Sequence, residues 1–269
     1  MPKQTDPTKL AQKLLESFIL GALQGIAEFL PISSSGHLLI AQELMNVNYQ
    51  GNVLEVATHL GTLLSIIVVF RNEIISLITG IKNKINQYYV IYLIIGTIPA
   101  VAFGLFVKIF IFDLIENIFV VAISLFITGL LLLKTKKIKI RSLPISFKIA
   151  ILIGLSQAVA VFPGISRSGI TIVTALYLGL CKEEAAKFSF FLAIPVILGA
   201  GILTFFDQKS LILVANQPSF FVMASISSFV AGLIFLSFLL NVIRKNNFYK
   251  FSYYCFFASA LSLAIFIIK

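Results

Sequence analysis

The sequence predicts an all-α polytopic membrane helix bundle, with six full spans, two re-entrant helix-turn-helix segments and an inverted-topology internal repeat. Composition is the first observation: 59% of the 269 residues are hydrophobic and 12% are charged, against roughly a quarter charged in a soluble domain. Apolar runs of spanning length are the second observation, and two broken apolar segments that match each other are the third. Together they predict a single integral membrane domain over residues 1–269.

Full spans are predicted where an apolar run reaches about 17 to 25 residues, the length that crosses a bilayer as a helix. Six runs meet this condition: Val53 to Phe70, Tyr88 to Val107, Asn117 to Leu133, Phe188 to Phe206, Phe220 to Leu240 and Phe251 to Ile268. The first residues of the chain are polar and show no apolar core followed by a small-residue cleavage site, so no cleavable signal peptide is expected.

The net charge of +10 comes mostly from loops between apolar segments. With alternating spans, fourteen Lys and Arg residues fall on one side and six on the other, while Arg167 lies inside an apolar region. The positive-inside rule therefore places the loop Lys134–Arg141 in the cytoplasm and both termini outside. Because the charges follow topology, no nucleic-acid partner is expected. Cys181 and Cys255 lie far apart without a CxxC motif, which indicates neither a disulfide framework nor a thiolate metal site.

Two further apolar segments, residues 14–44 and 145–180, are each interrupted near the middle by Pro, Gly and Ser. At a shift of 133 residues they match at Gly21 and Gly154, Gln24 and Gln157, Ala27 and Ala160, Phe29 and Phe162, Ile32 and Ile165, Ser33 and Ser166, Ser35 and Ser168, and Gly36 and Gly169. The pseudo-repeats then cover residues 14–133 and 145–268. Because each repeat holds three full spans, an odd number, the two are expected to lie in the membrane with opposite topology.

Each broken segment is interpreted as re-entrant, since non-helical backbone at membrane depth must be buried in protein or line a wet cavity. The two turns, "PISSSGH" and "PGISRSG", are expected to meet near the midplane. A helix begins after each turn, and its first N–H groups form an anion site at the positive end of the helix dipole. The serines there can cap these helix ends or contact a phosphate. The predicted substrate-binding residues are Ser33, Ser35, Gly36, Gly164, Ser166, Ser168 and Thr171.

Charged and titratable side chains flank these turns. Arg167 is a functional candidate because a guanidinium in a bilayer is costly unless it is paired, and its fork suits phosphate. Glu28 lies one helical turn after Gln24, and its carboxylate could hold a divalent cation, orient a base or neutralise Arg167. His37 could exchange a proton with a serine or a water molecule. The predicted catalytic residues are Ser34, His37, Glu28 and Arg167, and the predicted metal ligands are Glu28 and Gln24.

The stretches "QGIAEFLPISSSGH" and "PGISRSGIT" resemble the paired motifs of the undecaprenyl-diphosphatase family, also called the bacitracin-resistance proteins. The resemblance implies hydrolysis of undecaprenyl diphosphate, a polyprenyl diphosphate lipid, to undecaprenyl phosphate and inorganic phosphate. It implies a multi-pass protein of the bacterial plasma (inner) membrane with a site open to the extracytoplasmic side, a divalent cation such as Mg or Ca, and bacitracin resistance. The motif positions are filled by Gln24, Glu28, Ser34, His37, Ser166, Arg167 and Thr171. Gln24 departs from the glutamate of many relatives and can offer a metal only its carbonyl oxygen.

The residues leave several alternatives open. Ser34 could attack phosphorus with His37 as base, or His37 could activate water directly. A secondary transporter or flippase for an anion or lipid phosphate is the competing function, because inverted repeats with broken helices are typical of transporters. Acid-phosphatase-like lipid phosphatases need a histidine after the arginine, and this chain has none. His59 and Glu55 are second-rank site candidates, and the oligomeric state stays open, with a homodimer as one option.

Overall fold

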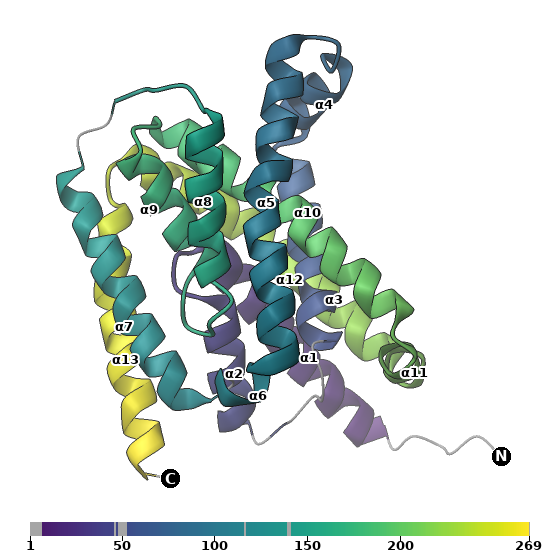
Figure 1. Ribbon diagram of the computed structural model, residues 1–269. Coiled ribbons are helices and arrows are strands. Elements are labelled where there is room, and N and C mark those ends of the chain that lie inside the picture. Colours follow the sequence, from purple (N-terminus) through teal and green to yellow (C-terminus); the bar gives the residue numbers. More distant parts are fainter. Residues whose placement is uncertain (1–6, 46, 48–52, 116, 139–140, 269) are drawn as a thin grey trace.

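The computed structural model describes residues 7–45, 47, 53–115, 117–138 and 141–268, and every regular element within these ranges is helical (Figure 1). In chain order the helices are α1 (Pro7–Phe29), α2 (Ser34–Leu44), α3 (Val53–Val69), α4 (Arg71–Thr79), α5 (Lys84–Phe110), α6 (Phe112–Ile115), α7 (Ile118–Lys134), η1 (Thr135–Lys137), α8 (Phe147–Val159), α9 (Arg167–Tyr177), α10 (Lys182–Phe206), α11 (Gln208–Asn216), α12 (Pro218–Arg244), η2 (Phe248–Lys250) and α13 (Phe251–Ile268). The predicted all-α membrane bundle is confirmed.

Five helical segments of the described chain are long and apolar enough to cross a membrane, and a bent pair brings the number to six. The five are Lys84–Val107, Ile118–Lys137, Lys182–Phe206, Pro218–Arg244 and Phe248–Ile268. The predicted span Val53 to Phe70 corresponds to α3, which has 17 residues, and the chain turns by 74° from α3 into α4. At about 1.5 Å per residue, α3 alone reaches slightly less than the roughly 30 Å of a hydrocarbon core.

The two broken segments form helix-turn-helix hairpins that enter from opposite ends of the molecule. Figure 1 shows α2 at the end that holds both chain termini, and α8 and α9 at the other end. Helix α8 has 13 residues, so at about 1.5 Å per residue it covers only part of a bilayer. The turns of the two hairpins meet inside the bundle, where the N–H of Gly164 in the second donates to Ser33 Oγ in the first, as the re-entrant interpretation predicted.

Long helices hold the hairpins in place. Helix α1 packs along α12, α8 packs along α5, and α7 packs along α13. Gly154 lets α8 approach α5 closely, because a Cβ atom at this position would lie 2.2 Å from the carbonyl oxygen of Gly96. Gly21 and Gly25 meet the backbone of α12 in the same way. Exchanging the halves of the chain converts the α1–α12 pairing into the α8–α5 pairing, which is the relation that the predicted repeat requires.

The hydrophobic core lies beside the start of the first turn. Phe29, the last residue of α1, is fully buried, and its ring packs edge-on against Phe190 of α10 at 5.6 Å between centroids. Phe70 packs against Phe190 and Phe191 from the end of α3. This aromatic cluster holds the point at which α1 ends, and therefore the direction in which the polar turn leaves it.

Candidate active site

The turns of the two hairpins are in direct contact. The N–H of Gly164 in the second turn donates to Ser33 Oγ in the first at 3.0 Å, and Ser168 Oγ donates to the carbonyl oxygen of Phe29 at 3.3 Å. A Cβ atom on Gly36 would lie 3.1 Å from Gly164 Cα, so the backbones themselves touch. The predicted meeting of the turns is confirmed by these contacts.

Local sequence chemistry explains both turns. Ser33 caps α2 and accepts from the N–H of Gly36 at 3.4 Å, and Ser166 caps α9 and accepts from the N–H of Gly169 at 3.0 Å. The φ of Gly164 is +97°, a region that glycine enters without steric cost. Ser33 has a φ of 70° without being glycine, so strong surrounding contacts must hold it there.

Several residues predicted to bind substrate are engaged within the protein. Ser33 and Ser166 cap their helices, and their Oγ atoms lie 3.4 Å from those of Ser35 and Ser168, respectively. Thr171 donates to the carbonyl oxygen of Arg167 at 2.7 Å and lies 2.5 Å from Ser189 Oγ on α10. These contacts brace the turns, so the geometry favours the capping alternative for Ser33 and Ser166.

Thr128 on α7 supports the second turn and was not among the predicted site residues. Its hydroxyl donates to the carbonyl oxygen of Gly164 at 3.0 Å and accepts from the N–H of Ser166 at 3.2 Å. A single threonine inside an apolar span carries no signal for this role, because only the packing of α7 against α9 brings it to the turn.

Glu28 is the centre of the polar cluster. One carboxylate oxygen, Oε1, accepts a hydrogen bond from Arg167 Nη2, and the other, Oε2, accepts from Ser34 Oγ at 2.8 Å. The carboxylate is almost fully buried, so the arginine is the countercharge that makes its burial tolerable. Arg167 Nη1 is buried and has no hydrogen-bond partner among the described residues. The structure thus joins three of the four predicted catalytic residues.

Gln24 and His59 complete one side of this cluster. Gln24 Nε2 lies 3.0 Å from Glu28 Oε2 and 3.0 Å from His59 Nδ1. An amide nitrogen facing a carboxylate is favoured over an amide oxygen there, so Gln24 donates and His59 Nδ1 accepts. His59 Nδ1 also lies 3.4 Å from Glu28 Oε2. His59, a second-rank candidate in the sequence, belongs to the site.

His37 is held away from Ser34. Its Nδ1 lies 2.8 Å from the carbonyl oxygen of Ser33, and its Nε2 lies 2.7 Å from the hydroxyl of Tyr254 on α13. The two rings are stacked at 5.5 Å between centroids. The group that accepts a hydrogen bond from Ser34 is therefore Glu28, not His37. Sequence reasoning missed Tyr254, which lies 217 residues from His37 in an apolar span.

A metal ion would find few ligands from the protein itself. No group of three His, Cys, Asp or Glu side chains suited to a metal occurs within the described ranges. Glu28 supplies a carboxylate, and Gln24 Oε1 is a buried oxygen without a partner in the part of the chain described. Magnesium often binds through one or two protein oxygens, with water and substrate phosphates completing its shell. Glu28 and Gln24 fit a cation of that kind, which needs the diphosphate to complete its coordination.

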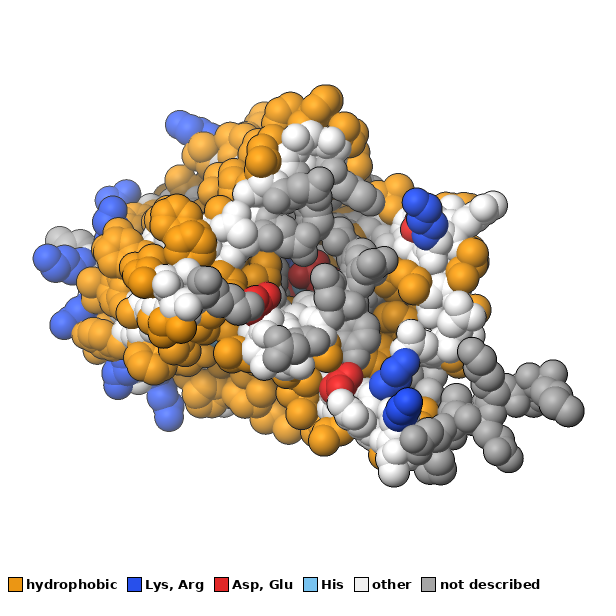
Figure 2. All heavy atoms as spheres, turned by 90° about the horizontal axis from the view of Figure 1, so that it is seen from below, with side chains coloured by type: hydrophobic (Ala, Val, Ile, Leu, Met, Phe, Trp, Pro, Cys, Tyr) orange, Lys and Arg blue, Asp and Glu red, His pale blue; other side chains and the backbone are white. Residues whose placement is uncertain are grey.

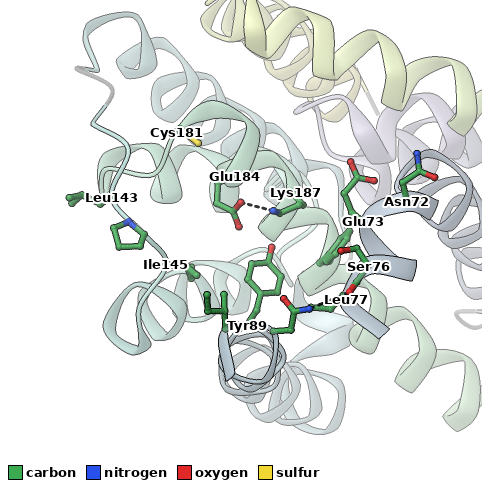
Figure 3. A pocket seen from close by; sticks show the side chains of 14 residues that line it. Asn72, Glu73, Ser76, Leu77, Tyr89, Leu143, Ile145, Cys181, Glu184 and Lys187 are labelled. Atoms are coloured by element: carbon green, nitrogen blue, oxygen red, sulfur yellow. Dashed lines mark hydrogen bonds and ion pairs between the residues drawn. The ribbon is translucent and has the colours of Figure 1, made fainter. Parts of the chain in front are cut away.

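The molecular surface differs between the two ends. Figure 2 shows the end that carries the termini, with a hollow near its middle and an acidic side chain at the bottom of the hollow. At the other end, a cavity of about 640 Å³ lies between α4, α5 and α10 (Figure 3). It contains none of the predicted site residues, and its Lys187 is paired with Glu184 at 2.6 Å and lies over the ring of Tyr89. That lysine is therefore already neutralised.

Comparison with known proteins agrees with the motifs. Residues 17–261 match the family described as Bacitracin resistance protein BacA. "Undecaprenyl-diphosphatase 1" of Bacillus cereus is 38% identical over 267 residues, covering 93% of this chain and 97% of the relative. "Undecaprenyl-diphosphatase" of Caldicellulosiruptor bescii is 39% identical over 265 residues, covering 94% and 98%. The protein of the same name from Korarchaeum cryptofilum is 35% identical over 255 residues, covering 90% and 95%. With both motifs joined at one buried site, the chain belongs to the bacitracin resistance protein BacA family.

Proposed function

We propose that this protein hydrolyses undecaprenyl diphosphate to undecaprenyl phosphate and inorganic phosphate. The observation that carries the proposal is the cluster of Glu28, Ser34 and Arg167 at the junction of two helix N-termini, in a chain of the BacA family. The curated relatives named above are called undecaprenyl-diphosphatases. Hydrolysis recycles the lipid carrier for cell-wall synthesis, and abundant enzyme would confer resistance to bacitracin.

Binding of the terminal phosphate follows from the charges at the junction. Helices α2 and α9 both begin there, so their first N–H groups and positive dipole ends face the anion. Arg167 can stay hydrogen-bonded to Glu28 through Nη2 while its buried Nη1 donates a hydrogen bond to a phosphate oxygen. Electrostatic stabilisation of this kind usually contributes most to the catalysis of phosphoryl transfer. A bound divalent cation, held by Glu28 and Gln24 Oε1, would spread further charge off the diphosphate oxygens.

The geometry favours Ser34 as nucleophile and Glu28 as its base. Ser34 Oγ already donates to the carboxylate at 2.8 Å, so Glu28 takes the proton as Oγ bonds to the terminal phosphorus. The bridging phosphorus–oxygen bond breaks and undecaprenyl phosphate leaves. Water then attacks the phosphorus of the phosphoserine, and the bond between phosphorus and Ser34 Oγ breaks. Glu28 returns its proton to Ser34 Oγ, and both protons of the attacking water leave with inorganic phosphate. Direct attack by water is the alternative and leaves no phosphate on Ser34.

The placement in the cell follows the charge distribution. We assign the protein to the bacterial plasma membrane with the site open to the extracytoplasmic side, which the hollow at the end of the termini supports (Figure 2). The positive-inside rule puts that end outside, because the opposite end carries Lys134, Lys136 and Lys137.

The test is release of inorganic phosphate from a polyprenyl diphosphate by purified protein in detergent, with and without chelator. We expect multiple turnovers that are lost with chelator and restored by Mg²⁺ or Ca²⁺. Rapid quenching with substrate labelled in the terminal phosphate should find label on Ser34. A transporter or flippase, the competing function, releases no phosphate, so an inactive parent protein would sink the enzyme proposal.

A further inference from the structure

We propose that Tyr254 is a positioning residue for the reaction: its hydroxyl fixes the imidazole of His37, which in turn holds the strained turn next to Ser34. The inference rests on the proposed function and extends it to the last helix of the chain. The hydroxyl of Tyr254 bonds to His37, whereas Ser34 bonds to Glu28, so Tyr254 acts through His37 rather than on the substrate.

The hydrogen bonds of His37 determine its tautomer. A backbone carbonyl can only accept, so the Ser33 oxygen at 2.8 Å requires the proton on Nδ1. In the neutral ring, Nε2 is then an acceptor, and the Tyr254 hydroxyl at 2.7 Å donates to it. Both nitrogens are engaged and the rings are stacked with 16° between their planes. This arrangement leaves the imidazole one orientation.

The orientation of the His37 ring affects the first turn because the ring is hydrogen-bonded to the backbone of Ser33. This residue has φ 70° and ψ 103°, a backbone region that a serine adopts only when its surroundings impose it. Its carbonyl oxygen accepts from both the imidazole Nδ1–H and the backbone N–H of His37, the latter at 3.2 Å. Its Oγ accepts from the N–H of Gly164 in the second turn. Since Ser34 follows Ser33 directly, the conformation of Ser33 sets where the nucleophile points.

The position of Tyr254 argues against a purely packing role. It is 43% exposed on α13, yet its hydroxyl reaches inward to a side chain from the first turn. Its neighbour Tyr253 is 59% exposed, and adjacent residues on a helix point about 100° apart. Tyr253 therefore offers a matched control, with the same side chain on the same helix but a different face.

The experiment compares Tyr254→Phe with Tyr253→Phe in the phosphate-release assay. Tyr254→Phe keeps the stacked ring and removes only the donor, so we expect kcat to fall about fivefold to tenfold with KM nearly unchanged, the size expected for one hydrogen bond. Tyr253→Phe should match the parent. In a His37→Ala background the Tyr254→Phe change should have no further effect, because its target is gone. An unchanged kcat in Tyr254→Phe, or an equal loss in the His37→Ala background, would overturn the proposal.

A second measurement separates this proposal from the proposed function. The chain contains two histidines, His37 and His59, so ¹⁵N spectra of labelled imidazoles are simple to assign with a His59→Gln variant. We expect His37 protonated at Nδ1 in both proteins, because the Ser33 carbonyl remains, and a shifted Nε2 signal in Tyr254→Phe, because Nε2 has lost its donor, whether or not the protein turns over. An inactive parent would defeat the phosphatase proposal alone, whereas identical His37 spectra in parent and Tyr254→Phe would defeat the role of Tyr254.

Discussion

The Glu28 carboxylate accepts hydrogen bonds from an arginine, a serine and a glutamine. Each of these partners comes from the sequence motifs around the two turns. The counterpart of Glu28 in the second repeat, Val161, has no charge to offer, so the site is asymmetric although the turns correspond. A buried carboxylate is tolerated only while its partners remain, and removing one partner of a buried pair costs about 3–5 kcal/mol. Catalytic and structural effects of mutations here must therefore be measured separately.

Ser34→Ala tests the nucleophile. The variant keeps the Glu28–Arg167 pair and removes the attacking oxygen, so we expect phosphate release to fall roughly a thousandfold or more. The melting temperature should change little, because a single hydrogen bond is lost. Ser237→Ala is the control, since that hydroxyl is exposed and donates to the carbonyl of Leu233 within its own helix. A phosphatase that still turns over rapidly without Ser34 would have to use water as its nucleophile.

Arg167→Lys separates charge from geometry. Lysine keeps a cation beside Glu28 but loses the planar fork, so we expect activity to drop about 100-fold while the folded protein persists. Arg167→Met should instead lose about 3–5 kcal/mol of stability, because Glu28 is left buried and unpaired. Arg71→Lys is the matched control, as Arg71 lies on the surface and donates to the carbonyl of Val68 near the end of α3. Equal activity of Arg167→Lys and the parent would show that the fork is dispensable.

At the scale of the elements, some glycines are required by the backbone conformation and close packing of the hairpins, and others are not. Gly164→Ala would place a Cβ atom 2.6 Å from the carbonyl oxygen of Val121 at a φ of +97°, so we expect a destabilised protein without activity. Gly199→Ala is the contrasting variant in α10, where a Cβ atom meets nothing within 4 Å. That change should stabilise the helix by about 0.5–1 kcal/mol and leave phosphate release unchanged. Thermal unfolding and activity of the two variants, measured together, check both statements.

The two glutamines of the repeated helices have different surroundings. Gln24 donates to Glu28 and lies against His59, whereas both side-chain polar atoms of Gln157 are buried without a partner among the described residues. Gln157→Met should therefore raise the melting temperature and keep activity within about twofold, since an unpaired buried amide is costly. Gln24→Met should lower activity. A melting temperature that falls in Gln157→Met would indicate that this amide has partners in the membrane.

At the scale of the whole molecule, opposite entry of the two hairpins brings two short polar turns together inside an apolar bundle. A single hairpin would leave its polar turn facing hydrocarbon, which the cost of unpaired polar groups disfavours. The hairpins join through contacts such as Gly164 with Ser33, while α12 and α5 hold their outer sides.

Orientation in the membrane is tested by labelling single cysteines. In a Cys181→Ser, Cys255→Ser background, we expect an impermeant maleimide to label Lys209→Cys in intact cells, because α11 lies at the end of the termini (Figure 1). Lys136→Cys, exposed at the opposite end, should be labelled only after permeabilisation. The reverse pattern would contradict the predicted orientation and the extracytoplasmic opening of the site.

Much of the fold follows from hydropathy, since apolar length alone decides whether a helix can cross a bilayer. The bend after Phe70 was not predicted: the apolar run ends there, and the sequence of α4, which has no buried residue, carries no signal for a 74° turn. Within the site, the pairing of Glu28 with Arg167 was among the alternatives that the sequence left open. The bond of His37 to Tyr254 was not among these alternatives, because nothing local to either residue encodes a contact across 217 positions.

The sequence by itself determined that this chain lies in a membrane, that two broken segments interrupt its spans, and that serines, a glutamate and an arginine gather at those breaks. These features depend on composition, length and spacing, which need no partner. Only the tertiary structure decided which carboxylate faces Ser34, which residues cap the helices and what orients His37. Those choices depend on distances of about 3 Å between helices far apart in the chain, and packing alone fixes such distances.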